Sequence, residues 1–442
     1  MKRVLIYSQD SLDAGDLRTM RGLVQRLVRS SGRLELRVIS AGAAAARGAS
    51  EWQGIRNITL PELRSTRGGR AKHGSSPMPL GAALQQRIQE IRETIEQFAP
   101  DMLLVDKLPL GLYDELAMIL PELKQAGSDV KCVLMLRDLI GSPAQTTHQW
   151  RERGYFNAIA EHYEKVLVLG EREIFDLRSE YLMPEMAAAK LEYCGYVEVA
   201  PGRSARARVR RALKVSDGQA LVLVTAGDGR DGETLLRNFI SGIQGLPEQR
   251  RPRAHIVCGA GMRESEHLWL ACAAHALPQI SFQHVSRDVM SLMAAADVVV
   301  ATGGYQKTCE LLTLQCRAVV VPSAAEALEQ TRRAERLATL GLLHLVRNEG
   351  LEPAQLMAAV LAEILMAKAE VTPCFENSTR GLDSVTSTLL GLMELPIERD
   401  LPSFENTQPA GWPDSVYEDS PLNLRIPEET GTLLQGGPGA LH

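Results

Sequence analysis

Apolar residues along the chain occur in short runs that alternate with longer amphipathic segments. In the first part of the chain, runs of strand length predict β-strands at residues 3–7, 34–40, 102–106, 131–136 and 165–169. Between them, apolar residues from Leu84 to Phe98 recur every three or four positions, which predicts a helix that ends before Pro100. Strands that alternate with helices are typical of βα units in a parallel sheet.

A second series of strands follows the basic stretch at residues 203–214. The predicted strands are residues 220–225, 254–258, 280–284, 297–301, 318–322 and 342–346. The pattern predicts an α/β protein with two doubly wound, Rossmann-like domains, residues 1–200 and 201–395, that face a cleft. In such folds ligands bind at the carboxyl ends of the strands, so the turns after the strands are where functional residues are expected.

Composition separates the body of the chain from its C-terminal end. The 442 residues are 45% hydrophobic and 23% charged, as in ordinary globular proteins, and the formal net charge of −5 is not that of a dedicated nucleic-acid binder. Residues 396–442 hold eight Asp or Glu against two Arg and seven Pro, which predicts a disordered acidic tail. Seven Cys without a C-x-x-C pair favour a cytoplasmic protein with buried thiols.

Two further features concern partners. No run of about 18 apolar residues is present, so membrane contact is expected to be peripheral at most. The segment at residues 61–79 is rich in Gly, Ser, Arg and Pro, which predicts a mobile loop. It is either a solvated insertion or a basic loop that holds an anionic acceptor or a lipid headgroup. The nine His are dispersed and indicate no metal site.

Glycine-containing turns follow three predicted strands. In the first turn, Gly15 and Asp16 precede a helix predicted from Leu17, where backbone N–H groups can hold a phosphate or Asp16 can cap the helix. In the second, Gly227 and Gly229 allow a ligand to approach the backbone, but the same spacing also makes an ordinary βα turn.

The third turn carries the most specific signal. Gly303 and Gly304 end a strand, and Thr308 lies in the first turn of the helix that follows. Glu310 comes soon after, where a carboxylate can accept both hydrogen bonds of a ribose diol. The pattern indicates a nucleotide site, and its alternative is a helix start with a favourably placed acid.

Residues 302–310, 317–322 and 329–337 together resemble the donor-binding half of MurG-like GT-B glycosyltransferases. The resemblance implies that Gly303, Gly304 and Thr308 approach the diphosphate of a nucleotide sugar and that Glu310 holds the ribose. It also implies that Glu329 and Gln330 hold hydroxyls of the donor sugar. Residues 196–201 are similar to the hinge between the two domains of that family.

The N-terminal half resembles a branch of predicted glycosyltransferases. Residues 10–18, 106–111 and 136–138 are similar to its signatures, but Asp13 and Asp16 stand where the family has glycine and histidine. That histidine faces the acceptor in the family, so a different base is needed here. A carboxylate can accept the proton, and the candidates are Asp16, Asp10 and Asp138, with Asp106 a further one; each can equally be a turn or cap residue.

The resemblance implies a metal-independent, inverting hexosyltransferase without a bound cofactor, in which helix N-termini and Arg or Lys stabilise the departing diphosphate. The donor is expected to be a UDP-sugar, and the acceptor a small molecule, a polysaccharide or a lipid-linked molecule. One alternative is a nucleotide-sugar hydrolase or 2-epimerase on the same fold. Another is a non-catalytic GT-B binding protein, in which Asp13 and Asp16 mark lost chemistry.

Overall fold

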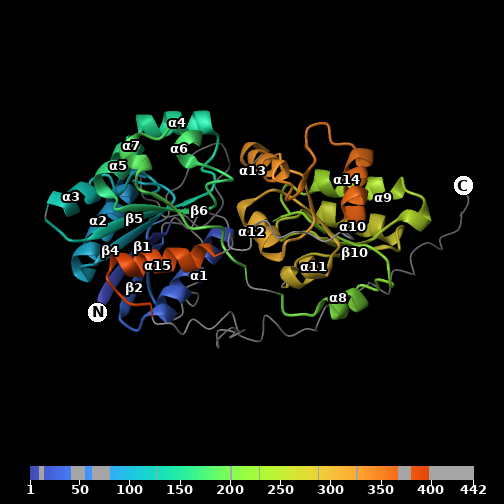
Figure 1. The fold of residues 1–442 in the computed structure, drawn as a ribbon, viewed down its shortest axis with the longest axis horizontal. Helices are drawn as coiled ribbons and strands as arrows, with labels where there is room; N and C mark the ends of the chain where they lie inside the picture. Colours follow the sequence, from blue (N-terminus) through green and yellow to red (C-terminus); the bar gives the residue numbers. More distant parts are fainter. Residues whose placement is uncertain are drawn as a thin grey trace, which may run out of the picture.

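The computed structural model describes residues 1–8, 14–40, 55–61, 80–125, 127–199, 202–227, 229–286, 288–324, 327–366 and 380–397. These residues form two parallel β-sheets, each packed between helices (Figure 1). The expected mobile loop at residues 62–79, the acidic tail from residue 398 and the domain boundary at residues 200–201 lie outside the described residues. Among the described residues no helix is long and apolar enough to cross a membrane.

The first sheet has seven strands among the described residues, in the order β3-β2-β1-β4-β5-β6-β7. The strands are β1 (Lys2–Ser8), β2 (Leu34–Ser40), β3 (Arg56–Thr59), β4 (Met102–Asp106), β5 (Lys131–Arg137), β6 (Lys165–Leu169) and β7 (Leu191–Tyr193). The helices of this part are α1 (Ala14–Ser30), α2 (Leu80–Phe98), α3 (Ile119–Gln125), α4 (Pro143–Glu152), α5 (Tyr155–His162), α6 (Leu177–Glu180) and α7 (Glu185–Ala188). All neighbouring strands are parallel, as the alternation of strands and helices predicts.

The second sheet has six strands among the described residues, in the order β10-β9-β8-β11-β12-β13, again all parallel. The strands are β8 (Leu221–Thr225), β9 (Arg253–Val257), β10 (Ile280–Gln283), β11 (Val298–Ala301), β12 (Ala318–Val320) and β13 (His344–Leu345). The helices are α8 (Arg206–Ala212), α9 (Glu233–Gln244), α10 (Glu264–His275), α11 (Val289–Ala295), α12 (Tyr305–Leu314), α13 (Ala327–Thr339) and α14 (Pro353–Met366), with the short 3-10 helix η3 (Glu248–Arg250).

Alternating side chains of each strand enter different cores, because both faces of the sheets are covered. In β1, Val4 and Ile6 belong to one buried cluster, whereas Leu5 and Tyr7 belong to another with Phe98 of α2. The first of these clusters is continuous across both domains through residues of the 194–199 segment. The two domains therefore share part of one hydrophobic core.

The last described helix returns to the first domain. Helix α15 (Gly381–Leu392) lies beside α1 (Figure 1), although the sequence pattern assigned residues up to 395 to the second domain. Arg26 Nε of α1 lies 2.6 Å from Asp383 Oδ1, and Lys131 Nζ of β5 donates to the Leu392 carbonyl at 2.6 Å. The C-terminal helix thus packs on the first domain, against α1 and β6.

All the predicted strands are present, within two residues of the expected bounds, and the expected fold class is confirmed. Two strands at the edges of the first sheet, β3 and β7, were not predicted, because they are short and carry few apolar residues. The expected buried thiols are present at Cys132, Cys194, Cys258 and Cys309. Residues 290–293 of α11 are also buried.

Candidate functional site

Two of the predicted turns lie next to each other at the carboxyl ends of β8 and β11. Thr225 pairs with Ala301 in the sheet, so the turns after these two strands begin side by side. Gly227 is exposed and has a φ of +64°, and a Cβ at this position would lie 3.2 Å from Thr302 Oγ1. The fold thus brings Gly227 and the 302–304 turn to one edge of the second sheet, as the sequence pattern predicts. We call residues 225–227 and 302–310 the second-sheet edge.

Gly229 does not face this edge. Its φ is +93°, and a Cβ would lie 2.7 Å from the Cys258 carbonyl oxygen and 2.8 Å from Met262 N. No other residue type fits this close contact between two turns of the protein. Gly229 was expected to contact a ligand. The structure instead places it in a packing contact inside the protein.

Helix α12 begins at the second-sheet edge with two different glycines. Gly304 is its N-cap residue, and a Cβ there would have open space around it, with no atom within 4 Å. Gly303 N donates to Gln330 Oε1 at 3.1 Å. The helix therefore presents its partially positive N-terminus with open space at Gly304, an arrangement that favours an anion. Thr308, expected to approach the diphosphate, is only 3% exposed.

Glu310 lies in the next turn of α12 and is held by two cations. The Glu310 side chain is only 4% exposed and forms an ion pair with Lys307 of the same helix. Arg18 Nη1 of α1, in the other domain, lies 3.6 Å from Glu310 Oε1. Because the Arg18 side chain is 62% exposed, it can leave this carboxylate more easily than Lys307 can. A ribose that binds Glu310 would take the place of Arg18.

Glu329 and Gln330, the predicted sugar-binding pair at the start of α13, have different surroundings. Gln330 is 4% exposed, and its Oε1 accepts hydrogen bonds from Gly303 N at 3.1 Å and Ser323 N at 2.9 Å. It joins the turns that follow β11 and β12, so this amide oxygen contacts the backbone in place of the expected sugar hydroxyl. Glu329 is 39% exposed and its Oε1 accepts from Arg333 Nη2 at 2.7 Å. Glu329 is thus the more accessible member of the pair.

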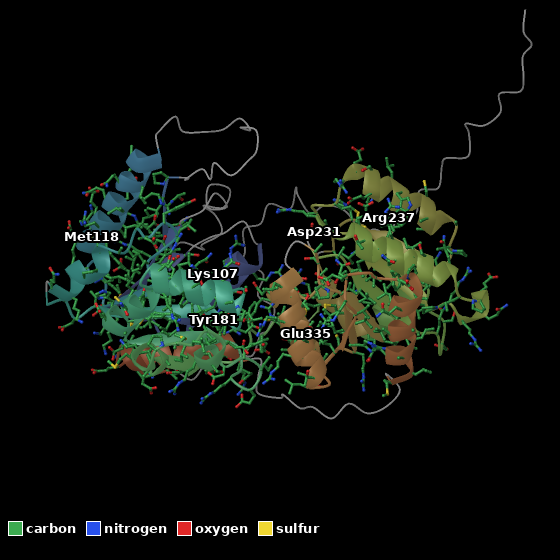
Figure 2. All side chains as sticks on the ribbon, turned by 90° about the horizontal axis from the view of Figure 1, so that it is seen from above. Lys107, Met118, Tyr181, Asp231, Arg237 and Glu335 are labelled. Carbon is green, nitrogen blue, oxygen red and sulfur yellow. The ribbon has the colours of Figure 1, made fainter. Side chains whose placement is uncertain are left out.

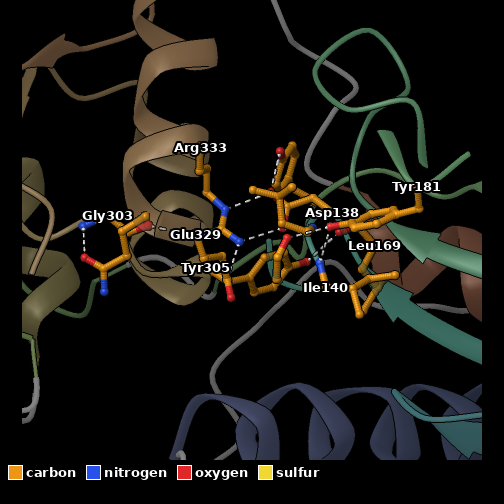
Figure 3. Close-up of polar contacts among 12 residues, drawn as sticks. Asp138, Ile140, Leu169, Tyr181, Gly303, Tyr305, Glu329 and Arg333 are labelled. Carbon is orange, nitrogen blue, oxygen red and sulfur yellow. Dashed lines mark hydrogen bonds and ion pairs between the residues drawn. The ribbon is translucent and has the colours of Figure 1, made fainter. Parts of the chain in front are cut away.

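Asp138 follows β5 as predicted, but its carboxylate is fully buried. Arg333 Nε donates to Asp138 Oδ2 at 2.8 Å and Arg333 Nη2 donates to Oδ1 at 2.9 Å, and both side chains are 0% exposed (Figure 3). Tyr196 Oη donates to Oδ2 at 3.0 Å and Leu139 N to Oδ1 at 2.8 Å. Because the carboxylate is 0% exposed and both oxygens hold donors of the protein, an acceptor hydroxyl does not reach it in this arrangement, so the structure does not support the expected catalytic role of Asp138.

The other candidate bases are placed differently. Asp10 lies outside the described residues. Asp16 lies within α1, which begins at Ala14 and not at Leu17, so Asp16 is in the first turn of the helix and not at its cap. Asp106 ends β4 and is only 2% exposed. The side chain of Asp16 also lies outside what the structure describes, so Asp16 and Asp10 stay predictions.

Residues around Arg333 connect the two domains. Tyr305, the first residue of α12, donates from Oη to the Leu169 carbonyl at the end of β6, at 3.1 Å (Figure 3). The Arg137 guanidinium lies over the Tyr305 ring at 5.1 Å, and the rings of Tyr196 and Tyr305 are 6.0 Å apart. Burial raises the pKa of Tyr305 well above its ordinary value, so its hydroxyl stays protonated as a donor.

Two residues of this site had no role in the sequence analysis. Arg333 stands four residues after Glu329, a spacing at which an acid and a base on one helix form an ion pair, and this was the available signal. Arg18 gave no such signal, because its partner Glu310 is distant in sequence.

Seen from above, the helix that carries Glu335, α13, lies on the side of the second domain that faces the first (Figure 2).

Comparison with known proteins agrees with this geometry. Residues 221–384 match the glycosyltransferase family 28 C-terminal domain. No curated protein matches the chain in sequence. Among solved structures, MurG from Acinetobacter baumannii is similar in fold, with a TM-score of 0.60 and 13% identity over 88% of this chain and 100% of that chain.

Two other solved structures have the same architecture. CalG4, the calicheamicin glycosyltransferase, gives a TM-score of 0.58 and 14% identity over 91% of this chain and 100% of that chain. The UDP-GlcNAc 2-epimerase from Neisseria meningitidis gives 0.57 and 12% identity over 89% of this chain and 100% of that chain. The chain therefore has the two-domain GT-B fold of these structures, and its residues 221–384 match the glycosyltransferase family 28 C-terminal domain.

Proposed function

We propose that the protein is a hexosyltransferase that takes a sugar from a nucleotide-diphosphate donor, a UDP-sugar, and transfers it to an acceptor bound by the N-terminal domain. The observation that carries the proposal is the second-sheet edge. There the open N-terminus of α12 at Gly304 and the carboxylate of Glu310 lie on one helix, within a glycosyltransferase family 28 C-terminal domain.

The chemistry assigned to each group follows from its position. The N-terminus of α12 stabilises the negative charge that develops on the departing diphosphate, and it does so without a metal. Glu310 accepts hydrogen bonds from the ribose after Arg18 releases it. Arg18 is then a free cation at the domain boundary, where it can pair with the diphosphate. Glu329 is the exposed carboxylate available to the sugar hydroxyls.

A thermal-shift screen tests donor binding directly. UDP-glucose, UDP-N-acetylglucosamine and the corresponding sugars of other nucleotides are added at about 100 times the expected Kd. A bound donor then stabilises the protein by roughly 2.7 kcal/mol. A shift with a nucleotide sugar supports the proposal. If none of these compounds raises the melting temperature, the donor assignment is wrong.

Product analysis separates transfer from the other reactions of this fold. With water as the only other reactant, a hydrolase releases free sugar and a 2-epimerase converts one UDP-sugar into its epimer. A transferase needs an acceptor, which we expect to be a small molecule, a polysaccharide or a lipid-linked molecule. Donor binding without any turnover would instead support a non-catalytic binding protein.

Asp16 is the proposed general base, and Asp16→Asn tests it. The substitution removes a carboxylate from the first turn of α1, which costs at most about 1 kcal/mol of stability through the helix dipole. We expect a loss of about 10² to 10⁴ in turnover with donor affinity retained, the usual range for removal of a general base. Steady-state rates and calorimetric titration of the donor measure both. Turnover at the parental rate would leave Asp10 as the candidate.

A further inference from the structure

The buried guanidinium of Arg333 contacts three segments at once. On the first domain it donates two hydrogen bonds to Asp138, at 2.8 and 2.9 Å. On the second domain Arg333 Nη1 donates to the Gly303 carbonyl at 3.1 Å, and Nη2 donates to Glu329 Oε1 at 2.7 Å (Figure 3). One side chain therefore holds the strand end of β5, the turn before α12 and the exposed carboxylate at the start of α13.

The position of this guanidinium depends on the carboxylate of the other domain. Burial alone would lower the pKa of Arg333, but the Asp138 carboxylate, with a smaller contribution from Glu329, raises it well above its ordinary value. A guanidinium that is 0% exposed and has lost its charged partner is strongly destabilised. Without Asp138 the remaining charged partner is Glu329, which is 39% exposed, so we expect the guanidinium to shift toward solvent together with Glu329 and to leave the Gly303 carbonyl.

The first domain fixes Asp138 firmly. Tyr196 Oη and Leu139 N each donate to its carboxylate, at 3.0 and 2.8 Å. A Cβ on Gly170, the residue after β6, would lie 2.7 Å from Asp138 Cβ, so the turns after β5 and β6 are in close contact. The acceptor of the Arg333 hydrogen bonds is thus rigidly placed.

We propose that Arg333 is a positioning residue that couples the contact between the domains to the shape of the nucleotide-sugar site. When Asp138 holds the guanidinium, Arg333 orients Glu329 and fixes the Gly303 carbonyl, and thereby the turn that ends at Gly304. When the domains separate, these contacts are lost and the site loosens. The assignment of this site to a nucleotide sugar rests on the proposed function, whereas the coupling itself does not.

Arg332 provides a matched control on the same helix. Its Nη2 lies 2.8 Å from Glu180 Oε2 of the first domain, so Arg332→Ala also removes an ion pair between the domains. No contact of Arg332 with Gly303 or Glu329 is present among the described residues. A difference between Asp138→Asn and Arg332→Ala therefore reports the route through Arg333 and not a general loosening of the interface.

Hydrogen exchange of the full chain, followed by mass spectrometry, tests the coupling without any ligand. In Asp138→Asn, peptides that contain Gly303 and Ser323 should exchange roughly 5- to 150-fold faster than in the parent, the range of ordinary coupling energies. These peptides belong to the domain that was not mutated. In Arg332→Ala they should exchange as in the parent. Equal exchange in Asp138→Asn and the parent, or equal acceleration in both variants, would overturn the proposal.

Calorimetric titration with UDP-glucose, UDP-N-acetylglucosamine and UDP tests the consequence for the donor. Asp138→Asn should bind the UDP-sugar that the parent binds best roughly 5- to 150-fold more weakly, with a smaller change for UDP, because Glu329 contacts only the sugar. Unchanged affinity would overturn the coupling. If the parent binds none of these compounds, the proposed function fails, while the exchange result still decides whether Arg333 couples the domains.

A second variant tests the same proposal if Asp138→Asn does not fold. Asp138→Leu combined with Arg333→Met replaces the buried ion pair by apolar side chains, a change that is often neutral for stability. This protein lacks the guanidinium contacts with Gly303 and Glu329. It should therefore show the same faster exchange of the Gly303 and Ser323 peptides as Asp138→Asn. Parental protection in the double variant would overturn the proposal.

Discussion

The molecule contains two buried Arg–carboxylate clusters of nearly the same chemistry. Arg87 pairs with Glu115 inside the first domain, and Arg333 pairs with Asp138 between the domains. In both pairs each side chain is 0% exposed, and the guanidinium donates two hydrogen bonds to the carboxylate. A tyrosine hydroxyl donates to the same carboxylate. Burial and hydrogen bonding therefore do not distinguish them.

They differ in what else the arginine holds. Arg87 Nη1 donates to the Pro61 carbonyl at 2.7 Å, and both Glu115 and Pro61 are residues of the first domain. Arg333 contacts both domains and two residues that the sequence assigns to the donor site. One ion pair thus contacts residues of the first domain, whereas the other links the two domains beside the proposed donor site. The surroundings of each pair, and not its chemistry, decide its role.

Glu115→Gln should have the largest effect on stability and none on the second-sheet edge. The substitution removes the carboxylate that faces the buried Arg87 guanidinium, which costs about 3 to 5 kcal/mol of the free energy of unfolding. Urea unfolding measures the loss, and titration of the remaining folded protein with the donor measures affinity. If Glu115→Gln weakened donor binding as much as Asp138→Asn, the two clusters would not differ in role.

Lowering the pH should destabilise the second domain, because His255 becomes protonated. This side chain lies on β9, 1% exposed, with Nδ1 2.9 Å from Ser281 Oγ, and burial lowers its pKa to about 4. Its pKa in the unfolded chain is about 6.5, so the folded state binds fewer protons. The stability from neutral His255 is complete above pH 6.5 and is lost as the pH falls toward 4, by about 2 kcal/mol at pH 5.

His255→Gln provides the check, because glutamine does not titrate. The parent should lose about 2 kcal/mol more than the variant between pH 7 and pH 5 in urea unfolding. If the free energy of unfolding had the same pH dependence in the parent and the variant, protonation of His255 would not destabilise the folded protein. The result would separate the acid response of the second domain from the ion pair that stabilises the first.

Arg332→Ala should have the smallest effect. The side chains of Arg332 and Glu180 are 40% and 29% exposed, so solvent screens their attraction. We expect a loss of less than about 1 kcal/mol in urea unfolding. A loss comparable to that of Asp138→Asn would mean that exposed pairs at this interface contribute as much as the buried one.

Sequence reasoning captured the parts of the fold that depend on local pattern. Buried strands such as β8 and β11 are almost entirely apolar, so their ends, and the glycine turns at 227 and 303–304, could be placed. The edge strands β3 and β7 are short and partly polar, and the return of α15 to the first domain depends on contacts that the sequence does not display.

The candidate site was predictable in position but not in detail. Gly229 and Gln330 fit the expected motif by spacing, yet the structure uses them for packing and for backbone hydrogen bonds. Asp138 is at a strand end as expected, but its partner Arg333 is 195 residues away. No local pattern can report a partner that only the folded arrangement of two domains brings near.

The central claim is that Glu310 belongs to a nucleotide-sugar site at the second-sheet edge, and calorimetric titration of a UDP-sugar into Glu310→Ala tests it most directly. Glu335→Ala is the control, since it removes a carboxylate that pairs with the exposed Arg347. We expect affinity about 10- to 150-fold weaker in Glu310→Ala, as for the loss of a charge-assisted contact of about 1.5 to 3 kcal/mol, and parental affinity in Glu335→Ala. Parental affinity in a folded Glu310→Ala protein would contradict it.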